Sequence, residues 1–284
     1  MMQLPGGILV NATLRRDFTF REFTGGLELM LNRQASPELN HVERVTQVLC
    51  NALASIGGQQ VSEELVSGLS VGDRQFLMRQ LAVHMDDRPV WLTAVCHHCA
   101  EKFDVSFLQS ELPVKPAGKG YPSRDVIVSL GKVTVSVPTG NDQLAVSGIT
   151  DNQKALRTLI ARLVKIKGRR PGLKPENLTA KDIEKIESAS EAMSPEIATE
   201  VLAVCPHCEA QNRLTATPYS CFEKSPDTLF SEVHAIAMHY HWREQDILDL
   251  PRARRQKYLQ LIDRSRGMAA HSHVKQEDHN GRFF

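Results

Sequence analysis

The chain has 284 residues, with 34 basic and 33 acidic side chains and a formal net charge of +1. Hydrophobic residues make up 42% and charged residues 24%, proportions typical of a globular protein with one large domain or two smaller ones. The balanced charge gives no reason to expect a strongly acidic or basic partner, and it argues against a chain that binds nucleic acid through its overall charge.

No run of residues reaches the roughly 18 apolar side chains of a membrane span. The first residues, MMQLPGGILVNATLRRDF, lack the basic leader and long apolar stretch of a signal or transit peptide. We therefore expect a cytoplasmic protein whose thiols stay reduced, so that its six cysteines do not form a disulfide framework. Four of the cysteines lie in two CxxC pairs, whereas Cys50 and Cys221 stand alone.

Residues 1–35 are predicted to form an N-terminal β segment, because GILVNATLRRDFTF alternates and TGGLELML follows a Gly-Gly turn. Residues 36–107 are predicted to hold helices and the first CxxC pair. A first helix over about 36–57 is indicated by apolar residues at helical spacing: Val42, Val45, Val48, Leu49 and Leu53. Leu65, Val66 and Leu69 precede a second helix, for which Asp73 is the expected cap. That helix carries Phe76, Leu77, Leu81 and His84.

Residues 108–195 are predicted to form an inserted segment with a β-hairpin and two helices. Clean alternation in VIVSLGKVTVSVPTG, with a turn at residues 130–132, predicts the hairpin. A helix over 151–167 is indicated by one apolar side: Leu156, Leu159, Ile160, Leu163 and Val164. TAKDIEKIESASEAM predicts the second helix, with Thr179 as its cap and Asp182 completing an approximate capping box.

Residues 196–224 are predicted to hold the second CxxC pair, and residues 225–267 are predicted to be helical. Ser225 is the expected cap of the first C-terminal helix, with Pro226 at its first helical position. REQDILDLPRARRQKYLQLIDRSRG is read as one further, basic helical stretch. Residues 268–284 are polar and rich in histidine, which predicts a disordered tail.

The two CxxC pairs occur in similar surroundings, AVCHHCAEKFDVSF and AVCPHCEAQNRLTA, each with a strand-like stretch before and after it. A tetrahedral zinc site needs four ligands, and two such turns at the tips of two hairpins would close it from opposite sides. The predicted ligands of this structural zinc ion are Cys96, Cys99, Cys205 and Cys208. The fold expected is α+β, with a zinc-ribbon-like β element whose two CxxC turns are separated by the 105 residues from 100 to 204. Ordinary spacings are about 15–20 residues.

Four alternatives to this zinc site stay open. The two turns could be free thiol turns, or one could be a thioredoxin-like redox motif, although AEKFDVSF after Cys99 does not resemble the opening of a helix. His98 could replace a thiolate, and iron could replace zinc. With four thiolates the metal would have no open position for water, so we expect a structural role in which metal binding contributes to folding.

No other motif assembles a catalytic centre, and we expect the protein not to be an enzyme. The histidines at 234, 239 and 241 lack HExxH spacing and are read as surface or packing residues. The loop KGRRPGLK and the basic cluster at residues 252–257 could meet phosphate or could simply be solvated. GxSxG and P-loop patterns are absent from the sequence.

Several stretches of the chain follow one another in a familiar order. They are LPGGILVNATLRRDFTFREFTGGLELML, LSVGDRQFLMRQL, the CHHC and CPHC turns, and HYHWREQDILDLPRARRQKYLQLI. Together they cover roughly residues 4–265, and the sequence resembles the T-even bacteriophage baseplate family, found in contractile-tailed phages, prophages and related contractile injection systems.

The resemblance implies a non-enzymatic protein of the tail baseplate, either a structural component or an assembly factor of the hub. It implies other baseplate, hub, spike or tape-measure proteins as partners, with no membrane and no small-molecule substrate. The location implied is the bacterial host cytoplasm during assembly, or the baseplate of the virion tail.

We expect the basic C-terminal helix to contact such a partner through its apolar stripe and neighbouring arginines. The predicted partner-binding residues are Tyr258, Leu261, Ile262, Arg254 and Arg255. The alternative function is a nucleic-acid-binding zinc-ribbon protein that uses its basic loops on phosphates. The near-neutral charge and the lack of aromatic residues interleaved with the basic ones argue against this alternative.

Overall fold

The computed structural model describes residues 2–33, 40–85, 87–129, 131–166, 177–219 and 226–267. The chain has a mixed α+β fold and separates into two compact units. Unit 1 comprises Met1–Arg21 and Met30–Lys224, and unit 2 comprises Glu22–Leu29 and Ser225–Phe284. Among the described residues, no helix is long and apolar enough to cross a bilayer.

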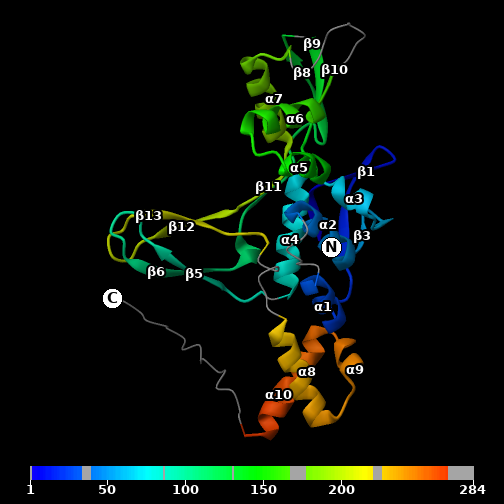
Figure 1. Ribbon diagram of the computed structural model, residues 1–284, viewed down its shortest axis with the longest axis vertical. Coiled ribbons are helices and arrows are strands. Elements are labelled where there is room, and N and C mark those ends of the chain that lie inside the picture. Colours follow the sequence, from blue (N-terminus) through cyan, green and yellow to red (C-terminus); the bar gives the residue numbers. More distant parts are fainter. Residues whose placement is uncertain are drawn as a thin grey trace, which may run out of the picture. The chain divides into compact units, whose positions relative to one another are not determined.

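An antiparallel four-stranded sheet opens unit 1 (Figure 1). Its strands, in the order β1-β2-β3-β4, are β1 (Gln3–Val10), β2 (Thr13–Phe20), β3 (Leu53–Ile56) and β4 (Gln59–Gln60). The prediction of strands at the start of the chain is therefore confirmed as far as Phe20. It is wrong for TGGLELML, which lies in the helix α1 (Gly25–Arg33).

Three helices pack beside this sheet: α2 (His41–Ala52), α3 (Glu63–Ser67) and α4 (Val71–Met85). The predicted first helix exists but ends at Ala52, because strand β3 begins at the next residue. Leu53 therefore belongs to the strand and not to the helix. The α4 cap is Ser70 and not the predicted Asp73: the Ser70 Oγ accepts the Asp73 backbone N–H at 3.1 Å.

Asp73 serves instead as a buried acceptor that joins three parts of unit 1. Its carboxylate accepts the backbone N–H groups of Gly6 and Gly7 at 2.7 and 3.1 Å, and the hydroxyls of Ser70 and Tyr121 at 2.8 and 3.0 Å. Glycine is needed at position 6, since a Cβ there would lie 2.5 Å from the carboxylate. Burial raises the pKa of Asp73, and the four donors oppose that rise.

The inserted segment contains the predicted hairpin and helices, together with elements that the sequence pattern missed. The hairpin is β8 (Ser123–Val128) with β9 (Gly131–Ser136); Leu130 of its predicted turn lies outside the described residues. The helices are α5 (Gly140–Ser147), α6 (Asn152–Leu163) and α7 (Ala180–Met193). The capping box of Thr179 and Asp182 at the start of α7 is confirmed.

The segment's short elements are the 3₁₀ turn η1 (Gln109–Glu111) and the strands β7 (Val114–Lys115), β10 (Val164–Ile166) and β11 (Glu196–Ile197). Strand β10 adds to β9, so Val164 belongs to a strand and not to the predicted helix face. A core of its own holds this part of the segment together: Val128, Val133, Val135, Val137, Ile160, Val164, Ile186 and Met193.

Unit 2 is a small helical unit in which a short early segment, Glu22–Leu29, joins the C-terminal part of the sequence. Its C-terminal helices are α8 (Asp227–Tyr240), α9 (Glu244–Leu248) and α10 (Arg252–Ser265). Pro226 is the cap of α8 and not its first helical residue, and Ser225 lies outside the described residues. The single basic helical stretch predicted here is two helices, because Pro251, which lacks a backbone N–H, stands immediately before α10.

Candidate metal centre

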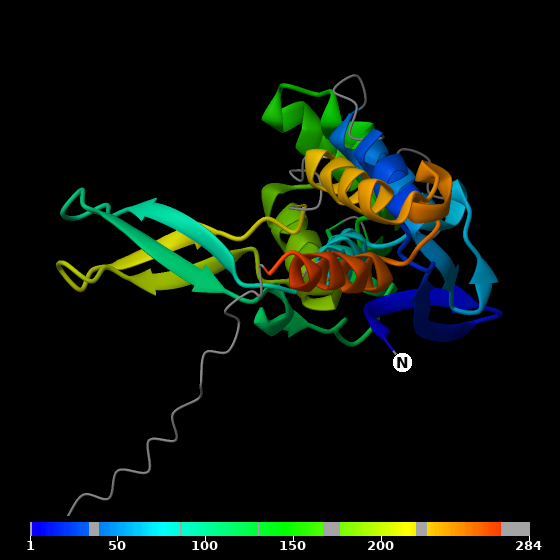
Figure 2. The same cartoon turned by 90° about the horizontal axis from the view of Figure 1, so that it is seen from below.

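Two β-hairpins of unit 1 hold the two CxxC turns at their tips. The first joins β5 (Val90–Val95) to β6 (Lys102–Phe107), and the second joins β12 (Glu200–Val204) to β13 (Gln211–Thr215). The hairpins lie side by side in the two views of Figure 1 and Figure 2. Alternate residues of the strands are buried, and Ala94 and Phe103 of one hairpin form a small core with Ala203 of the other. The predicted strands on both sides of each CxxC pair are therefore confirmed.

The two CxxC turns, here called knuckles 1 and 2, have the same backbone geometry. In knuckle 1 the Cys96 N–H bonds the Glu101 carbonyl at 2.9 Å, and the Ala100 N–H bonds the Cys96 carbonyl at 3.0 Å. Knuckle 2 repeats both bonds, from Cys205 to Ala210 at 3.0 Å and from Glu209 to Cys205 at 2.9 Å.

The residue after the second cysteine of each knuckle is left-handed. Ala100 has a φ of 61° and Glu209 a φ of 60°, although neither is glycine. This conformation turns the chain back into the second strand and directs both sulfurs of a knuckle to one side.

The four sulfur atoms converge as predicted. The Cys96 and Cys208 sulfurs lie 3.6 Å apart, the Cys99 and Cys205 sulfurs lie 3.8 Å apart, and all four lie within 4.8 Å of one another. A zinc ion bound by four thiolates at about 2.3 Å requires a tetrahedron of sulfurs with edges of about 3.8 Å. The arrangement therefore has the size of a four-cysteine metal site and could hold a metal ion.

Burial and hydrogen bonding shift the pKa values of cysteine thiols in this group. Cys96 and Cys205 are 2% and 0% exposed, and the other two cysteines are half-buried. A hydrogen bond from the Cys99 backbone N–H, with further donors from His98 and Asn212, lowers the pKa of Cys96 to about 5.

The neighbouring thiols respond in the opposite direction. The Glu101 N–H acts to lower the pKa of Cys99, but burial and the other three sulfurs outweigh it and raise that pKa to about 12. A donor from Ala210 acts to lower the pKa of Cys208, as does Cys99, but burial and the sulfurs of Cys96 and Cys205 outweigh them and raise that pKa. Four thiolates this close together would repel one another, so a positive ion between them would stabilise their charged forms.

Asn212 breaks the symmetry of the two hairpins. It stands on β13 where the first hairpin has Phe103, and it is buried. Its amide nitrogen lies 3.6 Å from the Cys96 sulfur and donates to the Ala210 carbonyl at 2.9 Å. Its amide oxygen accepts the backbone N–H of His97 at 3.0 Å. The second hairpin thus contacts the first knuckle directly through Asn212. The only signal for this residue in the sequence is that the second copy of the motif has Asn where the first has Phe.

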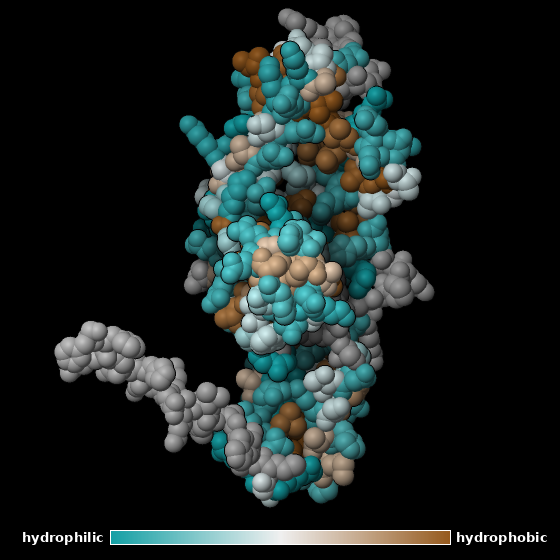
Figure 3. Space-filling view, turned by 90° about the vertical axis from the view of Figure 1, so that its left-hand side faces the viewer, coloured by the Kyte–Doolittle hydropathy of each residue, from teal (hydrophilic) through white to brown (hydrophobic). Residues whose placement is uncertain are grey.

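The histidines of the knuckles stay outside the sulfur group. Within the described ranges, the four cysteines form the one cluster of three or more potential metal ligands, and it includes no histidine. The His97 ring lies 2.9 Å from the Asn212 oxygen through Nδ1, and His98 and His207 are exposed. Figure 3 looks toward this side of unit 1, where moderately hydrophobic side chains gather among hydrophilic ones.

The five residues predicted to bind a partner differ in their burial within unit 2. Arg255 is 0% exposed and pairs with Glu28 and with Glu232, so it is a structural residue and not a surface one. Ile262 is also buried, in a cluster against which Tyr258 packs. Arg254 and Leu261 alone of the five are classed as exposed.

The other sequence candidates do not gather into a site within the described part of the chain. The whole basic loop KGRRPGLK, residues 167–174, lies outside the described residues. His234 and His239 lie on α8, and His241 ends it in a left-handed conformation with a φ of 57°.

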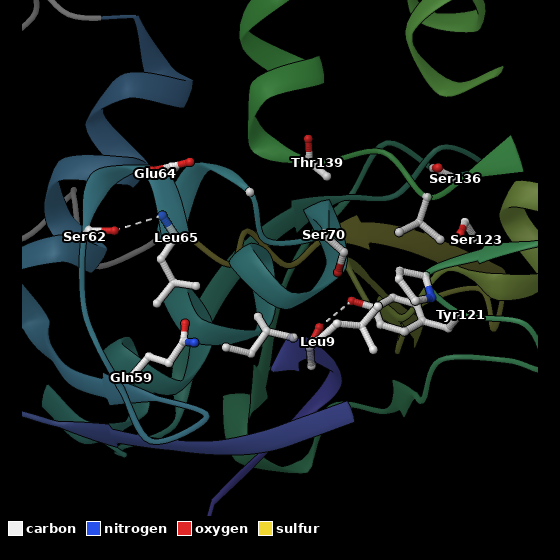
Figure 4. Close-up of a pocket in the computed structure, with 15 residues that line it drawn as sticks. Leu9, Gln59, Ser62, Glu64, Leu65, Ser70, Tyr121, Ser123, Ser136 and Thr139 are labelled. Carbon is white, nitrogen blue, oxygen red and sulfur yellow. Dashed lines mark hydrogen bonds between the residues drawn. The ribbon is translucent and has the colours of Figure 1, made fainter. Parts of the chain in front are cut away.

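A cavity of about 570 Å³ in unit 1 is the second place where ligand chemistry could be sought (Figure 4). Its walls carry hydroxyl groups, but four of these are already engaged within the protein, including that of Ser70, which donates to Asp73. Ser62 caps α3, Tyr121 donates to the Gly7 carbonyl, and Thr139 donates to Asp142. These hydroxyls therefore serve the fold, and the lining also includes Gln59, Glu64, Ser123 and Ser136.

Comparison of the chain with models of protein families, with curated proteins and with solved structures finds no match. Functional inference therefore starts from the sulfur cluster and from the sequence itself.

Proposed function

We propose that Cys96, Cys99, Cys205 and Cys208 bind one structural zinc ion in a zinc-ribbon-like element. The single observation that carries this proposal is the convergence of four sulfurs, two from each knuckle, within 4.8 Å. Thiolates are the ligands that zinc prefers in closed sites, and a site with four of them leaves no position for substrate or water. Iron is the competing metal, since the same donor set can hold it.

The proposed ion acts as a cross-link between distant parts of the sequence. Knuckle 1 precedes the inserted segment and knuckle 2 follows it, so a shared ion fixes both ends of that segment at one point. Strands β7 and β11 also pair across the segment, from Val114 to Ile197 and from Lys115 to Glu196. Metal binding and this short pairing therefore support each other, and the ion contributes directly to the stability of unit 1.

We further propose that the chain is a non-enzymatic protein of a contractile-tail baseplate, acting as a component of the hub or as a factor in its assembly. Support comes from the ordered stretches of the sequence, roughly residues 4–265, that resemble the T-even baseplate family. The closed structural metal site proposed above agrees with a role in building a particle. The partners proposed are hub, spike, tape-measure or other baseplate proteins, met in the bacterial host cytoplasm or in the tail.

Co-expression tests this role. The tagged chain is produced together with hub, spike and tape-measure proteins of a contractile tail, and complexes are isolated by affinity and size-exclusion chromatography. A stable complex with one of these proteins supports the proposal; their uniform absence from the isolated chain contradicts it. An anisotropy measurement with labelled oligonucleotides at two salt concentrations tests the alternative function, since nucleic-acid binding should weaken steeply as salt rises.

A further inference from the structure

Helix α10 presents a basic face to solvent, defined here as Arg254, Lys257, Leu261 and Arg264. These residues follow one another at intervals of three, four and three positions, so they lie on one side of the helix. All four are exposed, and Leu261 keeps 41% of its surface accessible. The opposite side, with Arg255 and Ile262, is buried against unit 2. The basic face is therefore the solvent side of a helix already fixed by its own core.

The positive charge on this face is not neutralised within the unit. Arg254, Lys257 and Arg264 form no ion pair with any residue that the structure describes. The one acidic residue of α10, Asp263, lies on the other flank of the helix, about 100° or more from the basic residues at 100° per residue. Three cations thus surround an accessible leucine with no acid among them.

An aromatic edge continues the basic face. Tyr258 lies one turn from Arg254 and from Leu261, and its ring contacts that of Trp242 edge-to-face, with centroids 5.0 Å apart. Trp242 is 36% exposed and stacks on Tyr240 with centroids 5.2 Å apart. These rings hold Trp242 in place at the surface. Tryptophan, tyrosine and arginine are the residue types that most often dominate protein–protein binding energy.

We propose that the basic face of α10, with its Trp242 edge, binds an acidic amphipathic segment of a partner protein. Apolar side chains of that segment would cover Leu261 and Trp242, and its carboxylates would face Arg254, Lys257 and Arg264. A protein segment fits better than a nucleic acid, because Tyr240 stacks on Trp242 and Tyr258 meets it edge-to-face, which leaves little open ring surface for a base. This inference rests on the proposed assembly function and names the chemistry of the partner.

The test uses the full chain and a fluorescein-labelled helical peptide of glutamate and leucine arranged at amphipathic spacing. Fluorescence anisotropy compares it with a lysine and leucine peptide of the same pattern. The acidic peptide should bind, and the double variant Arg254→Glu/Lys257→Glu should weaken it about tenfold or more. A matched control, Lys181→Glu/Lys185→Glu on α7, makes the same change in net charge at two exposed lysines of unit 1 and should leave the affinity within about twofold.

A third variant separates the apolar contribution from the charge. Leu261→Ser leaves every cation in place and should still weaken the acidic peptide severalfold. The inference is overturned by equal binding of the two peptides, by equal loss in the control variant, or by single-stranded DNA that binds this face more tightly than the peptide. Any of these results, with hub proteins still recovered in co-expression, would refute the named surface and leave the proposed function standing.

Discussion

The amide nitrogen of Asn212 lies 3.6 Å from the sulfur of Cys96, across 116 residues of sequence. The same side chain accepts the backbone N–H of His97, so one buried residue of the second hairpin holds two atoms of the first knuckle. The relationship fixes how the two knuckles face each other. It also places a hydrogen-bond donor against a sulfur that we propose as a metal ligand.

Replacing Asn212 by leucine should loosen the proposed metal site. Asn212→Leu keeps a side chain of similar size but removes the donor to Cys96 and the acceptor for His97, and such outer contacts typically change metal affinity by about 10–100-fold. The rate of zinc transfer to a chromogenic chelator should rise accordingly. Gln211→Leu, at the neighbouring exposed position, is the control and should transfer zinc at the wild-type rate. Equal rates in both variants would show that the contact does not support the site.

Replacing Ala100 by glycine should stabilise the protein, because a φ of 61° is costly for any residue with a Cβ. Ala100→Gly should raise the unfolding free energy of the metal-loaded chain by up to about 1 kcal/mol, after the extra flexibility of the unfolded glycine is subtracted. The melting temperature should rise with it. Ala100→Val should lower it, since a β-branched residue fits this region poorly. Calorimetry of the two variants checks both signs, and a melting temperature lowered by glycine would contradict the prediction.

The stability of unit 2 should be more sensitive to replacement of Arg255 than to replacement of its other side chains. Arg255→Ala leaves Glu28 and Glu232 buried without their cation, and uncompensated buried charge of this kind costs about 3–5 kcal/mol. Hydrogen exchange should show faster opening of α8 and α10, while unit 1 keeps its metal. The neighbouring Arg254→Ala removes an exposed cation and should change stability by less than about 0.5 kcal/mol. Similar exchange in the two variants would mean that the buried ion pairs do not hold the unit.

The lowered pKa of Asp182 predicts that the stability of the inserted segment depends on pH. Hydrogen bonds from the Ser129 hydroxyl and backbone, and from Thr179, hold the pKa of Asp182 well below its usual range. A lowered pKa means that the carboxylate stabilises the fold above the unfolded value of about 3.9, and that this contribution is lost as the pH falls below it toward the folded value. Asp182→Asn should therefore cost about 1–3 kcal/mol near pH 7.

The difference between wild type and Asp182→Asn should narrow as the pH falls below about 4. Urea unfolding at a series of pH values measures it. Asp125→Asn provides a surface control with a cost below about 1 kcal/mol, because its pair with Lys132 is solvent-exposed. A difference that stays constant from pH 7 to pH 3 would refute the assigned role of the carboxylate.

Much of the sulfur site could be predicted from the sequence, because the information is local to each hairpin. VWLTAV and KFDVSF alternate cleanly and form β5 and β6, and the capping box at Thr179 likewise depends on residues three apart. The helix ends at Ala52 and Leu163 were missed for a common reason. Each helix runs into a strand without glycine or proline, so Leu53 and Val164 continue the apolar spacing of the helix before them.

Other features have no local signal at all. The first residues of α1 belong to unit 2. A Cβ on Gly25 would lie 3.0 Å from the guanidinium of Arg255, a residue 230 positions further along the chain. Glu28 meets the same arginine over a separation of 227 residues. Helix α5 buries only Gly140 and Asp142 and therefore shows no apolar stripe. These elements are specified by long-range contacts, and periodicity could not reveal them.

The metal content of the purified chain tests the central claim most directly. Inductively coupled plasma mass spectrometry should find about one zinc ion per chain in the wild type. Cys205→Ser should lose the ion, whereas Cys50→Ser, which removes a lone thiol on α2, should keep it. A wild-type chain that contains no bound metal, or a Cys205→Ser chain with wild-type zinc content, would contradict the account.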